Sequence, residues 1–475
     1  MESKYKRLMS NTALFALSSF SSKLLSIVLQ PYITFAMGEV DEVGITKLVQ
    51  QIGLLLIPLV SMGVSFAIIR FGLEKTNDKR TVFTNGVVTI GCGFVLMALF
   101  YPLLKLIPLF SQYAVLLYLH VLFSCLRTLC TQFVRSRQLN RLVAVDGVMC
   151  SATNLGFMVL FLSGMKLGAS GYVLAVICSD LLSCLFIFLV ADLHRYFRWK
   201  RFSFPLWKKM MAYALPMVPA QISFWVISAS NLFFVQTLCE GFGGETGEYW
   251  TGLLSVGSFL PNMLTVLGTI FYEAWQLSAV TEENGRAAFF GRVFYIYQTL
   301  LFCCCSGIIL LCRPLMFLFR ENFYEAWRFV PLLTLGALFN CFNQFLSSVY
   351  MVEKRSSLSL ATMLPGAVIN CLLSWWLLGE FGPNAASFAS MMSYLLVFLL
   401  RVVTVRRLLP MRFRMPRLVL FTLLLSLEAW LMLQEVALWP LWCGIITLFI
   451  CLTGAKTLLS AVSQMLKRRR RKATS

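Results

Sequence analysis

Long apolar stretches recur along the whole chain, and they constrain its fold more than any other feature. A helix that crosses the hydrocarbon core of a bilayer needs about 20 mostly apolar residues. Because backbone groups in lipid must pair within the protein, such stretches predict an all-α polytopic membrane protein with about 14 transmembrane helices. The predicted spans cover residues 11–37, 48–71, 84–107, 112–134, 142–164, 169–191, 211–237, 250–273, 291–312, 328–351, 357–378, 384–404, 417–434 and 440–462.

The composition excludes most other classes of protein. Hydrophobic residues make up 59% of the chain and charged residues 13%, about half the charged share of an average soluble protein. A soluble enzyme, a secreted disulfide scaffold and a disordered protein are therefore excluded. The net charge of +20 does not indicate a nucleic-acid partner, because such binding needs an exposed basic face on a soluble domain.

The positions of the basic residues predict the orientation of the spans. With the N-terminus in the cytoplasm, 32 of the 41 Lys and Arg residues fall on the cytoplasmic side. This asymmetry favours an even number of spans with both termini inside. The basic run 467–472 is expected to anchor this topology, and binding of anionic lipid head groups is the alternative. Six basic residues fall on the opposite side: Lys47, Lys105, Lys166, Arg313, Arg320 and Arg328.

The chain shows no motif for catalysis, and no metal or cofactor is expected. It contains no HExxH zinc motif, no GxSxG nucleophile and no phosphate-binding loop. Its 15 cysteines lie almost wholly in apolar segments, where Cys behaves as a small hydrophobic residue. His120 and His194 are far apart in the sequence. We therefore expect a transporter without its own ATPase activity rather than an enzyme.

A weak internal repeat predicts the domain organisation. A shift of 203 residues aligns Gly44 with Gly247 and Pro58 with Pro261. Repeated halves are common in transporters. We therefore predict two six-helix lobes related by pseudo-two-fold symmetry, followed by two additional helices and a basic cytoplasmic tail. The predicted boundaries are 1–200, 205–410 and 411–475.

Basic residues inside predicted spans are candidates for substrate binding. An ionisable group near the bilayer centre costs about 2.5–3.5 kcal/mol on insertion scales, so such groups usually face a protein interior or a wet cavity. Lys23, Arg70 and Arg127 make the first half of the chain cationic, which suits an anionic passenger. Two alternatives stay open: Lys23 could form a structural ion pair with Asp180, and Arg127 could extend its charge to the interface.

Other polar residues in the spans complete the candidate site. Gln30, Gln221 and Asn231 are further candidates to line a substrate cavity, although amides in membranes often only join helices. Asp180 and Glu273 are candidates for coupling transport to H⁺ or Na⁺. For Glu273, a pair that fixes the topology is the alternative.

Several of these segments resemble Wzx-type oligosaccharide flippases. The resemblance is carried by Asn11–Leu25 in the first span, by Ile57-Pro58-Leu59 and Ala67–Phe71 in the second, and by Tyr213–Pro219 in the seventh. The number and spacing of the spans extend it over nearly the whole chain. The family belongs to the superfamily of multidrug, oligosaccharidyl-lipid and polysaccharide exporters.

The resemblance implies a specific function. Such proteins move undecaprenyl-diphosphate-linked oligosaccharides across the bacterial cytoplasmic membrane by alternating access, for cell-surface polysaccharide biosynthesis with other polysaccharide-assembly proteins. Their cationic cavity residues are matched here by Lys23 and Arg70. Many relatives have an Asp where this chain has Asn231, which puts ion coupling at that position in doubt.

The alternatives are a lipid II flippase or a multidrug exporter of the same superfamily. An exporter of cationic drugs is expected to have an acidic cavity and twelve spans, which the cationic first half and the two extra spans oppose. A membrane-embedded polysaccharide polymerase or glycosyltransferase is less expected. Such an enzyme usually needs a large outer loop, and the loops here hold about a dozen residues.

Overall fold

The computed structural model describes residues 28–74, 76–102, 111–281, 285–353, 355, 357–411 and 413–455. Every regular element within these residues is a helix. This confirms the predicted all-α fold. It follows from the composition, since a helix pairs its own backbone groups and needs no neighbouring strand in lipid.

The helices coincide with the predicted spans. Among the described residues, 11 helices are long and apolar enough to cross a membrane, or 12 if the bent pair 247–257 and 259–272 counts as one span. The first predicted span is described only at residues 28–37, which are helical. The last one corresponds to a shorter apolar helix, Trp439–Ala455.

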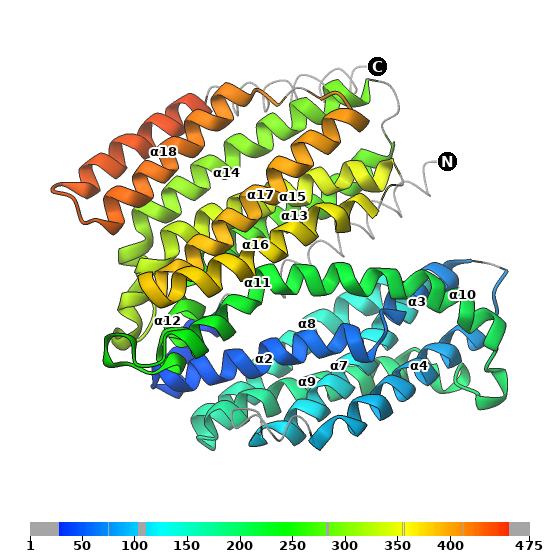
Figure 1. Cartoon of the computed structure of the whole chain (residues 1–475). Helices are drawn as coiled ribbons and strands as arrows, with labels where there is room; N and C mark the ends of the chain where they lie inside the picture. Colours follow the sequence, from blue (N-terminus) through cyan, green and yellow to red (C-terminus); the bar gives the residue numbers. More distant parts are fainter. Residues whose placement is uncertain are drawn as a thin grey trace, which may run out of the picture. The chain divides into compact units, whose positions relative to one another are not determined.

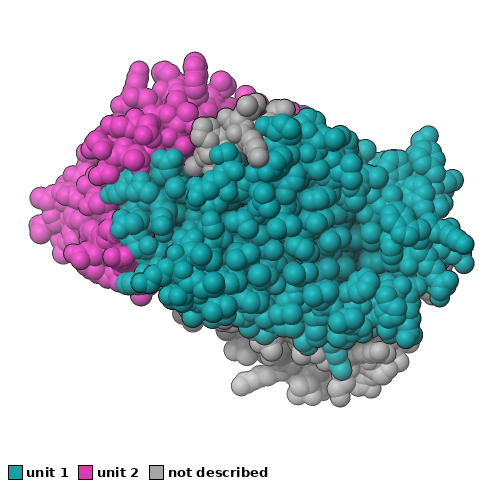
Figure 2. Space-filling model, turned by 90° about the horizontal axis from the view of Figure 1, so that it is seen from below, with its two compact units in different colours: residues 1–229, 248–252 teal, residues 230–247, 253–475 magenta. Residues whose placement is uncertain are grey.

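The chain divides into two compact units (Figure 2). Unit 1 comprises residues 1–229 and 248–252, and unit 2 comprises residues 230–247 and 253–475. The lobe boundaries and pseudo-symmetry expected from the sequence repeat stay a prediction.

The helices of unit 1 pack around α7 (Figure 1). This helix contacts α2, α3, α4, α8 and α9. Phe83 of α4 and Phe133 of α7 are both buried, with ring centroids 4.6 Å apart. The helices are α2 (Val40–Val60), α3 (Val64–Leu73), α4 (Lys79–Leu99), α7 (Ala114–Ser136), α8 (Asn140–Met158), α9 (Gly168–Val190), α10 (Phe204–Ala214) and the first part of α11 (Val218–Leu238).

The second predicted span, 48–71, is broken. Met62 and Gly63 both adopt positive φ angles, +49° and +65°, which end α2 and start α3 on a new axis. Gly63 also packs closely on α10, because a Cβ there would lie 2.9 Å from the carbonyl oxygen of Ala214. Glycine meets both demands, having no side chain and free access to positive φ.

The seventh predicted span, 211–237, is interrupted at its prolines. Residues 215–217 form a single 3₁₀ turn between α10 and α11, and Pro216 lies within it. A proline removes one helical hydrogen bond and clashes with the preceding turn. Of the two prolines expected to bend the span, Pro216 lies in this change of hydrogen-bond pattern and Pro219 lies in α11.

Unit 2 packs around α15, which contacts α13, α14, α16, α17 and α18 (Figure 1). Phe339, Phe342 and Phe345 of α15 and Phe398 of α17 are all fully buried in its core. The further helices are α12 (Gly247–Gly257), α13 (Phe259–Thr281), α14 (Arg286–Met316), α15 (Val330–Val352), α16 (Ser357–Phe381), α17 (Asn384–Leu408) and α18 (Met415–Leu433).

Large apolar side chains also cover the outside of these helices. Leu99 is 70% exposed, Leu189 68%, Trp375 69% and Leu423 62%. A soluble monomer rarely exposes apolar surface on this scale. These surfaces face lipid, and the protein is a multi-pass membrane protein.

Candidate functional site

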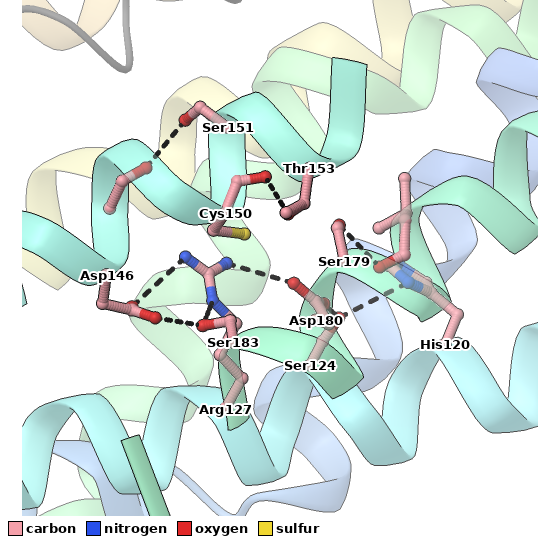
Figure 3. A network of polar contacts seen from close by, with 12 residues as sticks. His120, Ser124, Arg127, Asp146, Cys150, Ser151, Thr153, Ser179, Asp180 and Ser183 are labelled. Carbon is pink, nitrogen blue, oxygen red and sulfur yellow. Dashed lines mark hydrogen bonds and ion pairs between the residues drawn. The ribbon is translucent and has the colours of Figure 1, made fainter. Parts of the chain in front are cut away.

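A chain of polar contacts links three helices inside unit 1 (Figure 3). His120, Ser124 and Arg127 lie on one face of α7 because they are spaced by four and three residues. Asp180 and Ser183 share a face of α9 for the same reason. These side chains therefore meet at the packed contact between α7 and α9.

Arg127 and Asp180 form an ion pair at the centre of this group. Arg127 Nη1 lies 3.1 Å from Asp180 Oδ1. The hydroxyl of Ser124 donates a hydrogen bond to the other oxygen, Asp180 Oδ2. Ser124 Oγ is in turn 3.4 Å from His120 Nδ1. The sequence predicted separate roles for Arg127 and Asp180, in substrate binding and ion coupling, and the structure brings the two together.

A second carboxylate, Asp146 of α8, completes the group. Ser183 receives a hydrogen bond from Arg127 Nε at 2.9 Å and donates one to Asp146 Oδ1 at 2.5 Å. Arg127 Nη2 is 3.9 Å from Asp146 Oδ2. The side chain of Asp146 is only 1% exposed, whereas that of Arg127 is 31% exposed. One guanidinium thus serves two carboxylates, and the charge of Arg127 is already neutralised.

A different cation, Lys47, is held by neutral groups. Its Nζ donates to Gln30 Oε1 at 3.1 Å and to Gln50 Oε1 at 3.3 Å. The ring of Tyr172 lies 6.0 Å away. Within the described part of the chain, no carboxylate comes within salt-bridge distance of Lys47. Lys47 therefore has a charge that a bound anion could neutralise.

The placement of Lys47 corrects the sequence analysis, which put it in an outer loop. The membrane-spanning helix α2 begins at Val40, so Lys47 lies two turns inside it. Asp41 and Glu42 lower the hydropathy of the first turn, and the apolar run therefore appeared to start at residue 48. Both carboxylates stand near a helix N-terminus, where the helix dipole favours negative charge.

Arg70 lies in the last turn of α3 and is exposed. Its guanidinium carbon is 4.3 Å from the ring centroid of Tyr213. Stacking on an aromatic ring holds the guanidinium while leaving its edge free for an anion. The contacts place Arg70 apart from both the Lys47 group and the Arg127 group.

The predicted amide residues occupy three different settings. Gln30 contacts Lys47, and its Nε2 is buried without a hydrogen-bond partner among the described residues. Gln221 Nε2, on α11, is likewise buried and unpaired in that part of the chain. Buried amide donors of this kind are expected to bind water or a ligand.

Asn231 lies in unit 2, in a buried cluster without charge. Its Nδ2 donates to the Ala386 carbonyl and to Ser390 Oγ, both at 2.7 Å. Its Oδ1 accepts from Asn370 at 2.7 Å and from Ser374 at 2.9 Å. The amide of Asn231 is therefore fully used in joining α11, α16 and α17.

A buried carboxyl in unit 2 was not anticipated from the sequence. Glu428 of α18 is 0% exposed. It accepts hydrogen bonds from Ser306 at 2.7 Å and from Thr447 at 3.1 Å. No basic residue forms a salt bridge with it in the described part of the chain. These contacts fasten the last two described helices to α14.

Two predicted residues cannot be placed. Lys23 lies outside the described residues, and so does the side chain of Glu273 on α13. Within the described part of the chain, no group of three or more His, Cys, Asp or Glu residues is suited to a metal ion.

Four residues of these groups were not predicted as site residues from the sequence: Asp146, Ser183, Lys47 and Gln50. Asp146 carried a usable signal, because an acidic residue inside an apolar span is rare and calls for a partner. The others carried none, since their importance arises from which helix faces meet.

Comparison with known families agrees with the fold. Residues 8–266 match the family model described as polysaccharide biosynthesis protein. The chain belongs to this family. No relative of the chain is found among curated protein sequences.

Solved structures of similar fold are membrane transporters and flippases. The chain is similar to lipid II flippase MurJ in its inward closed conformation, with a TM-score of 0.71, 16% identity and coverage of 95% of this chain and 99% of that one. It is similar to a multidrug resistance MATE family transporter in its outward-facing conformation, with a TM-score of 0.60, 16% identity and coverage of 84% and 94%. A transporter of the same superfamily from Pyrococcus furiosus has a TM-score of 0.53, 14% identity and coverage of 83% and 94%. At these identities the likeness establishes the fold.

Proposed function

We propose that this protein flips undecaprenyl-diphosphate-linked oligosaccharides across the bacterial cytoplasmic membrane, with both termini in the cytoplasm. It acts by alternating access and without bond making or breaking. Membership of the polysaccharide biosynthesis protein family and a transporter fold both support this role. Other polysaccharide-assembly proteins would supply the lipid-linked substrate and use it after transfer.

The observation that carries the proposal is that Lys47, inside a membrane-spanning helix, has no carboxylate partner among the described residues. Its neighbours Gln30 and Gln50 offer amide groups but no negative charge. Keeping a lone ammonium group within a span is costly. A bound diphosphate would stabilise the ammonium group, because it brings both negative charge and hydrogen-bond acceptors to Lys47.

A lipid II flippase is the second candidate, because its substrate contains the same diphosphate and the MurJ fold covers nearly the whole chain. A carrier of organic cations is disfavoured, since Lys47 and Arg70 would repel its cargo. The two flippase functions differ in the sugar, so an assay must offer both substrates.

The test is transfer of lipid-linked substrates in proteoliposomes that contain the purified protein. We expect an undecaprenyl-diphosphate oligosaccharide to reach the opposite leaflet faster than in protein-free vesicles, and faster than lipid II does. The Lys47→Met variant should lose at least about tenfold in rate, which corresponds to about 1.4 kcal/mol, whereas Lys47→Arg should keep most of it.

The exposed loop residue Lys166 offers a matched control, because Lys166→Met removes the same charge outside the helices. It should transfer substrate like the unmodified protein. Faster transfer of lipid II would favour the second candidate. Unchanged transfer by Lys47→Met, or no transfer of either substrate, would contradict the proposal.

A further inference from the structure

The group around Arg127 contains more acid than base. Asp146, Asp180 and Arg127 come from α8, α9 and α7, and all three lie within membrane-spanning helices. If both carboxylates and Arg127 are ionised and the imidazole of His120 is neutral, two negative charges share one positive charge. The group then holds one uncompensated negative charge inside the protein (Figure 3).

The two carboxylates are not equivalent. Both oxygens of Asp180 are paired, one with Arg127 at 3.1 Å and the other with the Ser124 hydroxyl. Asp146 has one short hydrogen bond, from Ser183 at 2.5 Å. Its other oxygen lies 3.9 Å from Arg127 Nη2, which is beyond hydrogen-bond range. No other described residue donates to that oxygen, so Asp146 is the less stabilised anion.

Among the residues that the structure describes, none supplies a second cation next to Asp146. The titratable groups around it are Arg127 and Asp180 and the thiols of Cys130, Cys150 and Cys184, contributed by α7, α8 and α9. The thiols are neutral hydrophobic groups in this setting. The side chain of Asp146 is 1% exposed, so solvent contributes little to stabilising its charge. A buried charge without a partner is expensive.

We infer that this group is a proton-binding site and that the proton resides on Asp146. A hydronium ion transfers its proton to the Asp146 carboxylate and becomes water, so an O–H bond forms on Asp146 as one breaks on the donor. Arg127 and Asp180 then remain as a neutral ion pair. Arg127 is the more exposed member of the group, at 31% against 1% for Asp146.

The role of the bound proton rests on the proposed transport function, since proton binding offers a means of coupling substrate transfer to a proton gradient. Proton binding itself can be measured without any substrate. Failure of one proposal therefore leaves the other testable.

The experiment is pH-difference infrared spectroscopy on the purified full-length protein. A protonated carboxyl shows a carbonyl stretching band that an ionised carboxylate lacks. We expect a pH-dependent band that shifts when aspartate is labelled with ¹³C, which separates it from the carboxyl of Glu428. Asp146→Asn should abolish this band.

Asp180→Asn provides the decisive comparison. Arg127 then serves Asp146 alone, so Asp146 should ionise and its band at neutral pH should fall several-fold. A purely structural ion pair would show neither effect. Persistence of the band in Asp146→Asn would overturn the inference, and so would absence of a titrating aspartate band. If Asp146→Asn does not fold, an unchanged band in Asp180→Asn would overturn it equally.

Discussion

Arg127 of α7 and Asp180 of α9 are ion-paired, with 3.1 Å between Nη1 and Oδ1. Both residues lie in membrane-spanning helices, so the pair ties two spans together inside unit 1. Removal of one partner leaves a buried charge without compensation. The effects of substitutions at Arg127 and Asp180 on stability should therefore be non-additive.

Arg127→Met should lower the free energy of unfolding by about 3 kcal/mol, because the carboxylate of Asp180 would then be buried without a cation. The double variant Arg127→Met/Asp180→Asn should be more stable than Arg127→Met alone, since it also removes the carboxylate that Arg127→Met leaves unpaired. Thermal unfolding in detergent, arranged as a double-mutant cycle, measures the coupling. Additive effects of the two substitutions would show that the pair contributes nothing.

Asn231→Asp should destabilise unit 2 by about 1–3 kcal/mol at neutral pH. A carboxylate cannot donate to the Ala386 carbonyl, which now receives a hydrogen bond from Asn231 at 2.7 Å. Acidification should recover part of the loss, because the protonated acid regains a donor. The melting temperature of Asn231→Asp should therefore lie below that of the unmodified protein at neutral pH, and the difference should shrink as the pH falls. Equal melting temperatures at neutral pH would refute the role assigned to the amide.

Glu428→Ala should destabilise the protein by at least about 2 kcal/mol, because it opens a cavity and leaves the Ser306 and Thr447 hydroxyls with only each other as partners. Glu428→Gln keeps the shape and can still bond both hydroxyls, so it should stay within about 1 kcal/mol of the unmodified protein. Unfolding midpoints of the two variants give the comparison. An equal loss in both would mean that Glu428 acts through its charge.

Two glycines on α4 provide a matched pair for testing helix packing. A Cβ at Gly93 would lie 1.9 Å from the carbonyl oxygen of Val60, whereas a Cβ at Gly91 would meet nothing within 4 Å. Gly93→Ala should therefore cost about 3 kcal/mol or more, since the backbone of α2 must move. Gly91→Ala should be neutral or stabilising by up to about 1 kcal/mol. Melting temperatures that fall equally in both variants would contradict the close approach of α2 and α4.

The positions of the spans were predictable because a membrane helix must be apolar along most of its length. Each predicted span coincides with helical residues, the first of them at 28–37. The breaks were harder to foresee. Pro216 signalled one of them, but Met62 gave no signal, because methionine rarely adopts a positive φ.

The partners within the candidate site were less predictable. Arg127 and Asp180 could be recognised as polar residues in apolar spans, but their pairing depends on how α7 and α9 are rotated against each other. Lys47 was misplaced because hydropathy locates the apolar core of a helix rather than its first turn. The neutral cluster at Asn231 depends on three helices that are distant in sequence, so no local pattern reveals it.

The break between α2 and α3 places Lys47 and Arg70 on two separate helical segments. Around Met62 the backbone hydrogen bonds switch to three-residue spacing, as in Met62 N–H to the Leu59 carbonyl and Val64 N–H to the Ser61 carbonyl. A continuous helix transmits torque and tilt along its length, and this joint does not. A change in the tilt of α2 would therefore move Lys47 without moving Arg70, which lies on α3.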